Sequence, residues 1–342
     1  MTNERALTLL VTGGAGFIGS HTCVELLNAG HAVVVLDNLS NSSEKALDSV
    51  RRITNRTLDF VRGDLRDEGC LDRLFDEHAI DAVIHFGGLK AVGESVATPL
   101  RYYDNNVNGT LQLMEAMQAH SVKTIVFSSS ATVYGNPSRI PATEDLPTGA
   151  TNPYGRSKLM IEHLLQDLYA SDPDWRISLL RYFNPVGAHI SGELGEDPRG
   201  TPNNLLPYIA QVAIGRLPYL RIFGNDYPTP DGTGVRDYIH VVDLAQGHLA
   251  ALQFLQRGPQ LAIHNLGTGK GTSVMEALRA FERASGKTIP FRVVERRPGD
   301  IAECYADTSK AERELGWTAR LNLDDMCRDA WRWQSRHPNG FG

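Results

Sequence analysis

A short apolar run, Leu7 to Val11, leads directly into the glycine-rich segment Thr12 to Gly19 and then into a helical pattern. A strand, a glycine loop and a helix in this order are the context that a dinucleotide-binding fingerprint requires. Gly13 permits the tight turn, Gly16 lets backbone approach a pyrophosphate, and Gly19 allows close packing of the helix on the strand. Glycine loops also occur as plain turns, so the next strand has to support this interpretation.

The second predicted strand, Ala32 to Leu36, ends in Asp37, and 37 − 19 = 18 residues separate this carboxylate from Gly19. An acidic residue about 20 residues beyond the glycines holds the adenosine ribose hydroxyls in this type of fold. The carboxylate would repel a 2′-phosphate, and residues 38–41 contain no arginine or lysine to accept one. The sequence therefore predicts NAD and not NADP.

Tyr154 and Lys158 stand four residues apart and so share one face of a predicted helix. A free tyrosine ionises near pH ~10, so a neighbouring ammonium must lower the pKa of the phenol before it can act as a base at neutral pH. A lone pair of this kind is usually an ordinary surface pair. Together with the glycine loop and Asp37, it indicates an enzyme that uses a nicotinamide cofactor.

Short apolar runs alternate with helical segments through the first half of the chain, which predicts an α/β fold with a Rossmann-type, doubly wound parallel sheet. Candidate site residues follow three of the predicted strands, at 86–90, 128–130 and 182–184. From 185 to 234 the chain is rich in Gly, Pro, Asn and Asp, with a helical stretch at 205–215. We expect long loops there that cover a ligand.

The length of 342 residues suggests roughly two domains. We predict a nucleotide-binding Rossmann domain at 1–184, to which a later segment at about 236–270 returns. Residues 185–342 are expected to form mainly a smaller C-terminal α+β domain, with the substrate bound between the two domains.

The net charge of −6 is spread along the chain without basic runs, which argues against nucleic acid or an anionic membrane as the main partner. No apolar run approaches the ~20 residues of a membrane span, and the first residues lack a signal-peptide pattern, so a cytoplasmic location is expected. The four cysteines and the histidines lack the spacings of metal ligands. We predict no metal site.

Several motifs are those of a known family, and they occur in the same order along the whole chain. They are Thr12–Gly19 followed by Ser20–Thr22, Leu89–Ser95, Ser128–Tyr134, Tyr182–Gly187, Pro202–Leu205, Val235–His240 and Arg296–Asp300. With these motifs the chain resembles the extended short-chain dehydrogenase/reductase family, and within it the family of UDP-glucose 4-epimerases.

The resemblance implies reversible epimerisation of UDP-galactose and UDP-glucose at sugar carbon 4, through a transient 4-keto sugar, as part of galactose metabolism. Tyr154 would serve as general base and then as general acid. Lys158 would lower the pKa of Tyr154 and hold the nicotinamide ribose, and Ser130 would hydrogen-bond to the reacting sugar oxygen. Because the reaction is redox-neutral, NAD is expected to stay bound as a prosthetic group.

The cofactor contacts implied by the loop and by the family motifs follow the successive strands. They are Gly13, Gly16, Phe17, Ile18, Gly19, Asp37, Asn38, Leu39, Ser40, Asn41, Ser42, Asp64, Leu65, Phe86, Gly87, Gly88, Lys90, Asn105, Ser128, Tyr154, Lys158, Tyr182 and Phe183.

The substrate contacts implied by the resemblance lie mainly in the second half of the chain, where two guanidinium groups suit a pyrophosphate. They are Lys90, Ser130, Tyr154, Asn184, Asn204, Leu205, Arg221, Ile222, Phe223, Arg236, Arg297, Asp300 and Cys304. Arg221 is expected to contribute its backbone more than its charge, and the same two arginines, Arg236 and Arg297, could instead form surface ion pairs.

Cys304 occupies a position at which some family members carry a bulky tyrosine beside the 2-position of the sugar. A smaller side chain leaves room for an N-acetyl group, so we expect activity on UDP-N-acetylglucosamine and UDP-N-acetylgalactosamine as well. The resemblance also implies a homodimer, for which 99–120 and 154–169 are the candidate interface segments.

Three other functions stay open. A nucleotide-sugar 4,6-dehydratase needs an acid/base pair after its serine or threonine, where this chain has Ala131 and Thr132; a UDP-glucuronate decarboxylase is a similar alternative. The third candidate is a non-catalytic protein that binds NAD or a UDP-sugar, and the presence of Ser130, Tyr154 and Lys158 argues against it.

Overall fold

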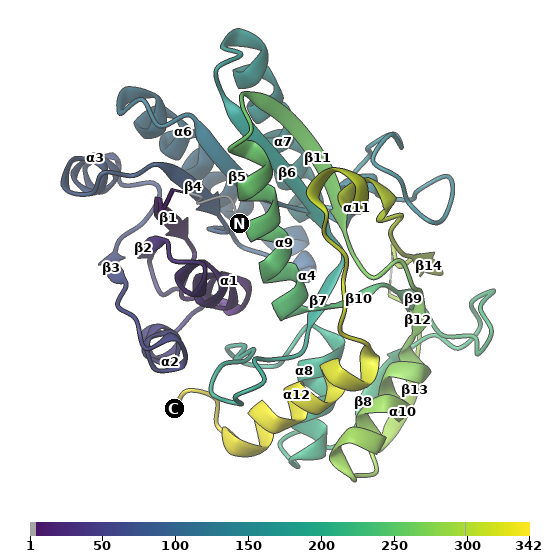
Figure 1. Ribbon diagram of the computed structural model, residues 1–342. Helices are drawn as coiled ribbons and strands as arrows, with labels where there is room; N and C mark the ends of the chain where they lie inside the picture. The colour runs from purple at the N-terminus through teal and green to yellow at the C-terminus, as the bar shows by residue number, and fades with distance from the viewer. Residues whose placement is uncertain (1–4, 298) are drawn as a thin grey trace. The chain divides into compact units, whose positions relative to one another are not determined.

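A computed structural model describes residues 5–297 and 299–342, and its contacts divide the chain into two compact units (Figure 1). The first unit comprises 1–135, 148–181 and 245–264, and the second comprises 136–147, 182–244 and 265–342. Among the described residues, no helix has both the length and the apolar character needed to cross a membrane.

The first unit is built on a seven-stranded sheet with the strand order β11-β6-β5-β4-β1-β2-β3. Its strands are β1 (Thr8–Thr12), β2 (Ala32–Asp37), β3 (Asp59–Arg62), β4 (Ala82–His85), β5 (Thr124–Ser130), β6 (Arg176–Tyr182) and β11 (Gln260–Leu266). The pairs β1/β2, β1/β4, β2/β3 and β4/β5 are parallel. The predicted doubly wound parallel sheet is confirmed, and its order reverses between β1 and β4, where such sheets bind ligands.

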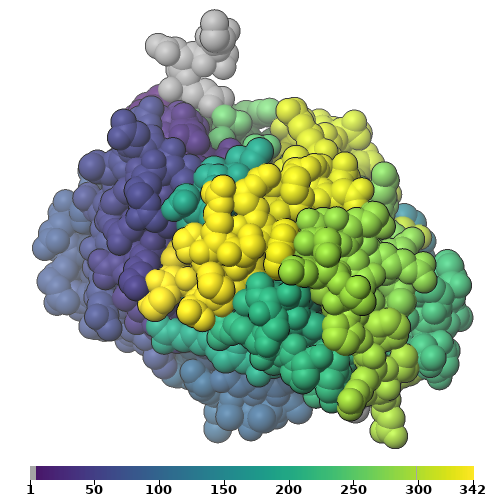
Figure 2. Space-filling model, turned by 90° about the horizontal axis from the view of Figure 1, so that it is seen from below, coloured from purple at the N-terminus to yellow at the C-terminus, as the bar shows by residue number. Residues whose placement is uncertain are grey.

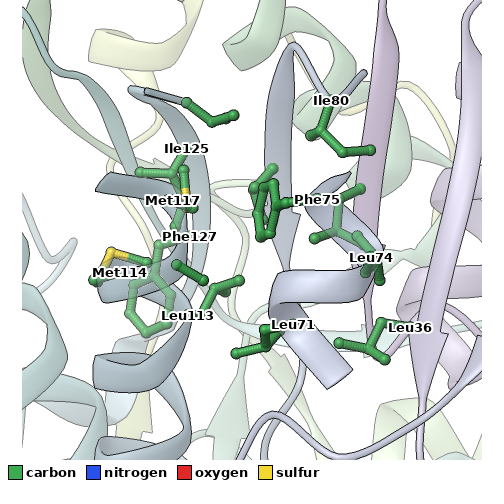
Figure 3. Packing of buried hydrophobic residues seen from close by; sticks show 14 of the residues in the cluster. Leu36, Leu71, Leu74, Phe75, Ile80, Leu113, Met114, Met117, Ile125 and Phe127 are labelled. Atoms are coloured by element: carbon green, nitrogen blue, oxygen red, sulfur yellow. The ribbon is translucent and has the colours of Figure 1, made fainter. Parts of the chain in front are cut away.

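Apolar side chains on both faces of the strands explain why helices cover the sheet on two sides. On one face, residues of β1, β4 and β5 pack against three helices, α3 (Glu68–Glu77), α6 (Gly109–Ala119) and α7 (Pro153–Ser171). Figure 3 shows this core, with Leu71, Leu74 and Phe75 of α3 facing Leu113 and Met117 of α6. The alternate strand residues are buried as well.

Further helical segments complete this unit. They are α1 (Phe17–Asn28), α2 (Glu44–Thr54), α4 (Val92–Ala97), α5 (Pro99–Tyr102), the π-helix η1 (Tyr103–Asn108) and the 3₁₀ turn η2 (Ala131–Tyr134). Helix α9 (Val241–Leu255) begins in the second unit and continues into the first.

The second unit combines small sheets with four helices. Its strands are β7 (Asn184–Val186), β8 (Leu220–Phe223), β9 (Val235–Arg236), β10 (Tyr238–His240), β12 (Thr272–Ser273), β13 (Phe291–Val294) and β14 (Glu303–Cys304), and its helices are α8 (Leu205–Ala213), α10 (Val274–Ser285), α11 (Ser309–Leu315) and α12 (Leu323–Arg336). Helices α8, α10 and α12 share one apolar core. Figure 2 shows them side by side in green, yellow-green and yellow.

The sequence did not predict that 136–147 would belong to the second unit. Ala142 donates its N–H to the carbonyl of Tyr305 at 2.9 Å, and its carbonyl accepts from the side chain of Asn265 at 2.9 Å. These partners lie more than 120 residues away in sequence, so only the tertiary structure determines this grouping. The segment that returns to the first unit is 245–264, within the predicted 236–270.

Candidate active site

The glycine loop between β1 and α1 is packed so closely that larger residues would not fit at two positions. Gly13 has φ +70°, and a Cβ on it would lie 2.9 Å from the backbone nitrogen of Gly87. A Cβ on Gly19 would lie 2.8 Å from the Cα of Gly14. No side chain caps the first turn of α1, which contains no acidic residue and starts at Phe17 and Ile18. This helix N-terminus is therefore suited to an anionic group.

Asp37, at the end of β2, is buried and accepts three hydrogen bonds that connect neighbouring loops. Its carboxylate accepts from the backbone N–H of Ala15 at 3.0 Å, from the N–H of Leu39 at 2.9 Å and from the hydroxyl of Ser42 at 2.8 Å. The glycine loop and residues 38–42 are thereby held around one carboxylate. Ser40 and Asn41, in the same segment, are exposed.

A second carboxylate fixes the far side of this segment. Asn38 donates from its side chain to Asp64 at 2.9 Å, and Arg66 pairs with Asp64 at 2.8 Å. The hydrogen bonds from Arg66 hold the pKa of Asp64 well below its usual range, so Asp64 stays charged. The side chain of Leu65 lies beside Gly87, where a Cβ would come within 2.7 Å of it.

The loop after β4 is held by Asn106, a residue that the sequence analysis did not select. Asn106 is buried in the π-helix η1, accepts from the N–H of Leu89 at 2.7 Å and donates to the carbonyl of Leu89 at 3.0 Å. It also donates to the hydroxyl of Ser157 on α7 at 3.0 Å. The predicted cofactor residue Asn105 donates to the Asn106 oxygen at 3.0 Å. Single-turn π-helical segments are frequent at functional sites.

A row of buried polar side chains also holds the loop after β4 in place. The ring of His85 lies 2.6 Å from the Thr12 hydroxyl and 2.9 Å from the Thr110 hydroxyl, and the Thr12 hydroxyl accepts from the N–H of Gly87 at 3.2 Å. Burial lowers the pKa of His85 to about 3, and the charge of Lys158 acts in the same direction. His85 is therefore neutral at physiological pH. The ring of the next residue, Phe86, contacts the ring of His248 in a tilted arrangement, with the centroids 4.7 Å apart. Gly88 and Lys90 are exposed.

Helix α7 presents Tyr154 and Lys158 to the end of β5. The helix begins where Asn152 accepts from the N–H of Gly155 at 2.9 Å, with Pro153 at its first position. Lys158 is 5% exposed, donates to the carbonyl of Ser128 at 2.7 Å and has its ammonium 4.8 Å from the centroid of the Phe127 ring. Burial lowers the pKa of Lys158 to about 7.

Tyr154 is hydrogen-bonded to Ser130. Burial raises the pKa of Tyr154 above its ordinary value, and the hydrogen bond to Ser130 lowers it in part. Burial is the larger of these two effects on the pKa of Tyr154, and the ammonium of Lys158 is directed to the carbonyl of Ser128. The lowering of this pKa by Lys158 stays a prediction. Ser130 also accepts from the N–H and the hydroxyl of Thr132, at 3.2 and 3.0 Å.

In the second unit, three of the predicted arginines form a cluster, and two of them lie over the ring of Phe223. The guanidinium of Arg297 lies 3.8 Å from the centroid of the Phe223 ring, and that of Arg221 lies 5.6 Å from it. Arg236 pairs with Asp300 at 3.8 Å. Burial lowers the pKa of Arg297, and the charges of Arg221 and Arg236 act in the same direction while Asp300 opposes them. The cluster is thus rich in positive charge relative to its one carboxylate.

The other predicted residues of this unit lie around the cluster or in its core. Cys304 pairs with Arg236 across β14 and β9, and Asn184 donates its N–H to the carbonyl of Asp237 at 3.0 Å. Ile222, Tyr182 and Phe183 are buried. Asn204 and Leu205 stand at the start of α8, where Asn204 donates to Glu196 at 3.1 Å. The described contacts therefore gather most predicted site residues into two groups, one in each unit.

Within 5–297 and 299–342, no group of three or more His, Cys, Asp or Glu residues could hold a metal ion. His240 is buried and lies 3.4 Å from Asp329.

Comparison with known proteins gives matches over nearly the whole chain. Residues 10–330 match a family model described as GDP-mannose 4,6 dehydratase. The UDP-glucose 4-epimerase of Bacillus subtilis is 62% identical over 335 residues, covering 98% of this chain and 99% of the relative. The human UDP-glucose 4-epimerase is 59% identical over 341 residues, covering 98% of each chain.

The chain belongs to the UDP-glucose 4-epimerase family.

The fold of this chain agrees with a solved structure of that family. The crystal structure of the UDP-glucose 4-epimerase from Bifidobacterium longum, in complex with NAD+ and UDP, superimposes with a TM-score of 0.95 at 58% identity, covering 97% of this chain and 99% of the other. The predicted family resemblance is confirmed.

Two buried polar groups beside the predicted site residues escaped the sequence analysis. One is Asn106. The other is the buried pair of Glu162 and Arg181, with Ser129 beside it. The spacing of Tyr154, Lys158 and Glu162 at four-residue intervals is a signal that could have drawn attention to Glu162. The partner of Glu162 is Arg181 on strand β6, and no local sequence pattern indicates this pairing.

Proposed function

We propose that the protein interconverts UDP-glucose and UDP-galactose by inverting carbon 4 of the sugar, with NAD as a bound cofactor. The observation that carries the proposal is the arrangement of Ser130, Tyr154 and Lys158 at the end of β5, in the same unit as the glycine loop and Asp37. Relatives about 60% identical over nearly their full length bear the name of this activity.

The residues present fit NAD. A Cβ on Gly13 would collide with Gly87, so the loop keeps open backbone in front of the uncapped N-terminus of α1, where a pyrophosphate is favoured. Asp37 supplies the carboxylate for the ribose and disfavours a 2′-phosphate. NAD, when bound, accepts hydride from carbon 4 and returns it, and its positive ring favours the phenolate form of a nearby tyrosine.

Tyr154 takes the proton of the sugar 4-hydroxyl and gives it back at the end of the cycle. Because burial raises the pKa of Tyr154, its ionisation depends on nearby positive charge as well as on the hydrogen bond from Ser130. Lys158, fixed against Ser128, is the nearby cation of α7. Ser130 holds the reacting oxygen beside the phenol.

The arginine cluster of the second unit is proposed to hold the UDP group. Arg236 and Arg297 carry the positive charge for the diphosphate, with Asp300 fixing Arg236. Phe223, under the guanidinium of Arg297, is proposed to pack against the nucleoside. Cys304, the strand neighbour of Arg236, is proposed to leave room for an N-acetyl group on the sugar.

The 4,6-dehydratase named by the family model is a weaker candidate. Elimination at carbon 6 needs an acid/base pair of side chains after Ser130, and the side chain of Ala131 has no ionisable group. The hydroxyl of Thr132 donates to Ser130 at 3.0 Å, and an aliphatic alcohol is far too weak an acid for this step. The decarboxylase and the non-catalytic binding protein account less well for the intact arrangement of Ser130, Tyr154 and Lys158.

An NMR time course with UDP-galactose and UDP-N-acetylgalactosamine in one tube, without added NAD, tests the proposal. We expect both to convert to their gluco forms. Conversion of UDP-galactose alone would remove the argument from Cys304 and keep the mechanism. If neither converts, even after NAD is added back, the proposed activity is wrong.

We also propose a homodimer. Helices α4, α5, α6 and α7 carry exposed apolar side chains, and Leu100 is 81% exposed. These side chains are Val92, Val96, Leu100, Leu111 and Met160. Light scattering should give twice the chain mass, and Leu100→Glu should shift the protein toward the monomer. A monomeric wild type would contradict this proposal, and the cytoplasmic location stays a prediction of the sequence.

A further inference from the structure

Three successive turns of α7 each contact one residue of the serine run that ends β5. Tyr154 is hydrogen-bonded to Ser130, and Lys158 donates to the carbonyl of Ser128 at 2.7 Å. One turn further along, Glu162 accepts from the hydroxyl of Ser129 at 2.5 Å. The third contact is as buried as the second, although the mechanism above uses only the first two.

Glu162 is a carboxylate with no exposed surface, and it is fixed on two sides. Arg181 on β6 donates to it from Nε at 2.9 Å and from Nη2 at 2.6 Å. The guanidinium of Arg181 in turn lies 4.9 Å from the centroid of the Tyr134 ring. A planar two-point pair of this kind holds a carboxylate in one orientation. The charge of Glu162 therefore has a defined position, one helical turn from Lys158.

The surroundings of Lys158 contain few charged groups that could keep it protonated. From β5 it meets the carbonyl of Ser128 and the ring of Phe127, and from β4 it meets His85, which burial keeps neutral. On its own helix Tyr154 carries no charge until it ionises, and Arg181 on β6 is itself a cation. Glu162 is the carboxylate that acts on Lys158, and it favours the ammonium form against the effect of burial.

We propose that Glu162 is a positioning residue that keeps Lys158 protonated and directed at Ser128, and thereby sets the upper pH limit of the activity. The inference rests on the proposed function for its kinetic consequence, but its electrostatic part is independent of the substrate. Arg181 holds Glu162 in place through its two hydrogen bonds. Neither residue touches the reacting atoms.

The first test is the pH dependence of kcat/KM of the holoenzyme with UDP-galactose in Glu162→Gln. Removal of the negative charge lowers the pKa of Lys158, so the loss of activity at high pH should begin about one pH unit lower than in the wild type. Ser129→Ala is the matched control, because it removes one hydrogen bond and keeps the charge, and its profile should match the wild type. The NAD content of each variant is measured alongside.

The second test does not depend on turnover. The carbon-13 NMR signal of the Lys158 ε-carbon, assigned by its loss in Lys158→Met, should titrate near neutral pH in the NAD-free wild type and at lower pH in Glu162→Gln. A change in this titration in a protein that fails to epimerise any sugar would support the electrostatic role and reject only the proposed function. An unchanged titration in folded Glu162→Gln would overturn the inference.

Glu162→Gln leaves Arg181 buried without its counter-charge and so risks misfolding. The double variant Glu162→Leu, Arg181→Met replaces the ion pair by apolar side chains of similar length, which buried pairs often tolerate. Of the two charges, Glu162 is the one that acts on the pKa of Lys158, so the double variant should still move the titration downward. A titration identical to the wild type in this variant would also overturn the inference.

Discussion

Asn106 donates a hydrogen bond of 3.0 Å to the hydroxyl of Ser157, which lies three residues beyond Tyr154 on α7. The same side chain makes two hydrogen bonds to the backbone of Leu89. The loop after β4 and the helix that carries Tyr154 and Lys158 are therefore fixed to each other through one buried amide. This contact gives Asn106 a part in the site that its position in the sequence does not reveal.

Asn106→Ala should lower both stability and NAD retention. The variant leaves the N–H of Leu89 without its acceptor in a partly buried position, which costs about 1–3 kcal/mol of unfolding free energy. Thermal unfolding and the NAD content of the purified protein measure the two effects. Asn108→Ala is the matched control, because Asn108 is exposed and contacts only Asp104 among the described hydrogen bonds. Equal behaviour of the two variants would contradict the assigned role.

Tyr154→Phe should reduce kcat about 10²–10⁴-fold while NAD remains bound, because it removes only the hydroxyl that transfers the proton. Turnover by NMR and cofactor content after denaturation give the two quantities. Thr132→Val is a useful comparison, since it removes a hydrogen bond to Ser130 without touching the phenol, and its effect should be several-fold at most. Turnover unchanged in Tyr154→Phe would refute the catalytic assignment.

Arg297→Met should raise KM for UDP-galactose roughly 10–100-fold, the range expected when a charge-assisted contact to a phosphate is lost. Neighbouring Arg296 offers a matched control, because its guanidinium already pairs with Asp226 at 2.7 Å. Arg296→Met should change KM little. Steady-state kinetics of the two variants at two salt concentrations measures both values of KM. Equal effects of Arg297→Met and Arg296→Met would reject a specific role for Arg297.

Cys304→Tyr should abolish conversion of UDP-N-acetylgalactosamine and leave conversion of UDP-galactose within a few-fold of wild type. The expected cause is steric, since the half-buried Cys304 is small and sits next to Arg236 on the neighbouring strand. Cys304→Ser, which keeps the size, should retain both activities. Retention of the acetylated reaction in Cys304→Tyr shows that this position does not select the sugar.

The buried ammonium of Lys158 predicts a dependence of stability on pH. The pKa of Lys158 is lowered to about 7 in the folded protein and returns to an ordinary value of about 10.4 on unfolding. Burial of the ammonium therefore lowers the unfolding free energy most strongly below pH 7, and this destabilisation disappears as the pH rises toward 10. Relative to Lys158→Met, wild-type unfolding free energy should therefore rise by about 2–4 kcal/mol between pH 7 and 10. Urea unfolding at matched NAD content measures it, and a constant difference would contradict burial of the charge.

The sequence determined those parts of the protein whose chemistry is local. The nucleotide-binding sheet was predicted from the glycine loop, from Asp37 and from the strand that precedes each of them. This was possible because a tight turn and a helix N-terminus need particular residues at fixed spacing. Tyr154 and Lys158 share a helix face for the same reason. These predictions needed no knowledge of distant contacts, and the strand order agrees with them.

Only the tertiary structure decided what surrounds these residues. The carbonyl of Ser128 accepts a hydrogen bond from the ammonium of Lys158, and burial raises the pKa of Tyr154 while the hydrogen bond to Ser130 lowers it. Asn106 and the pair of Glu162 with Arg181 acquire their partners from elements 17 to 51 residues away. Hydrogen bonds and desolvation depend on which segments meet in space, and no periodicity along the chain records that.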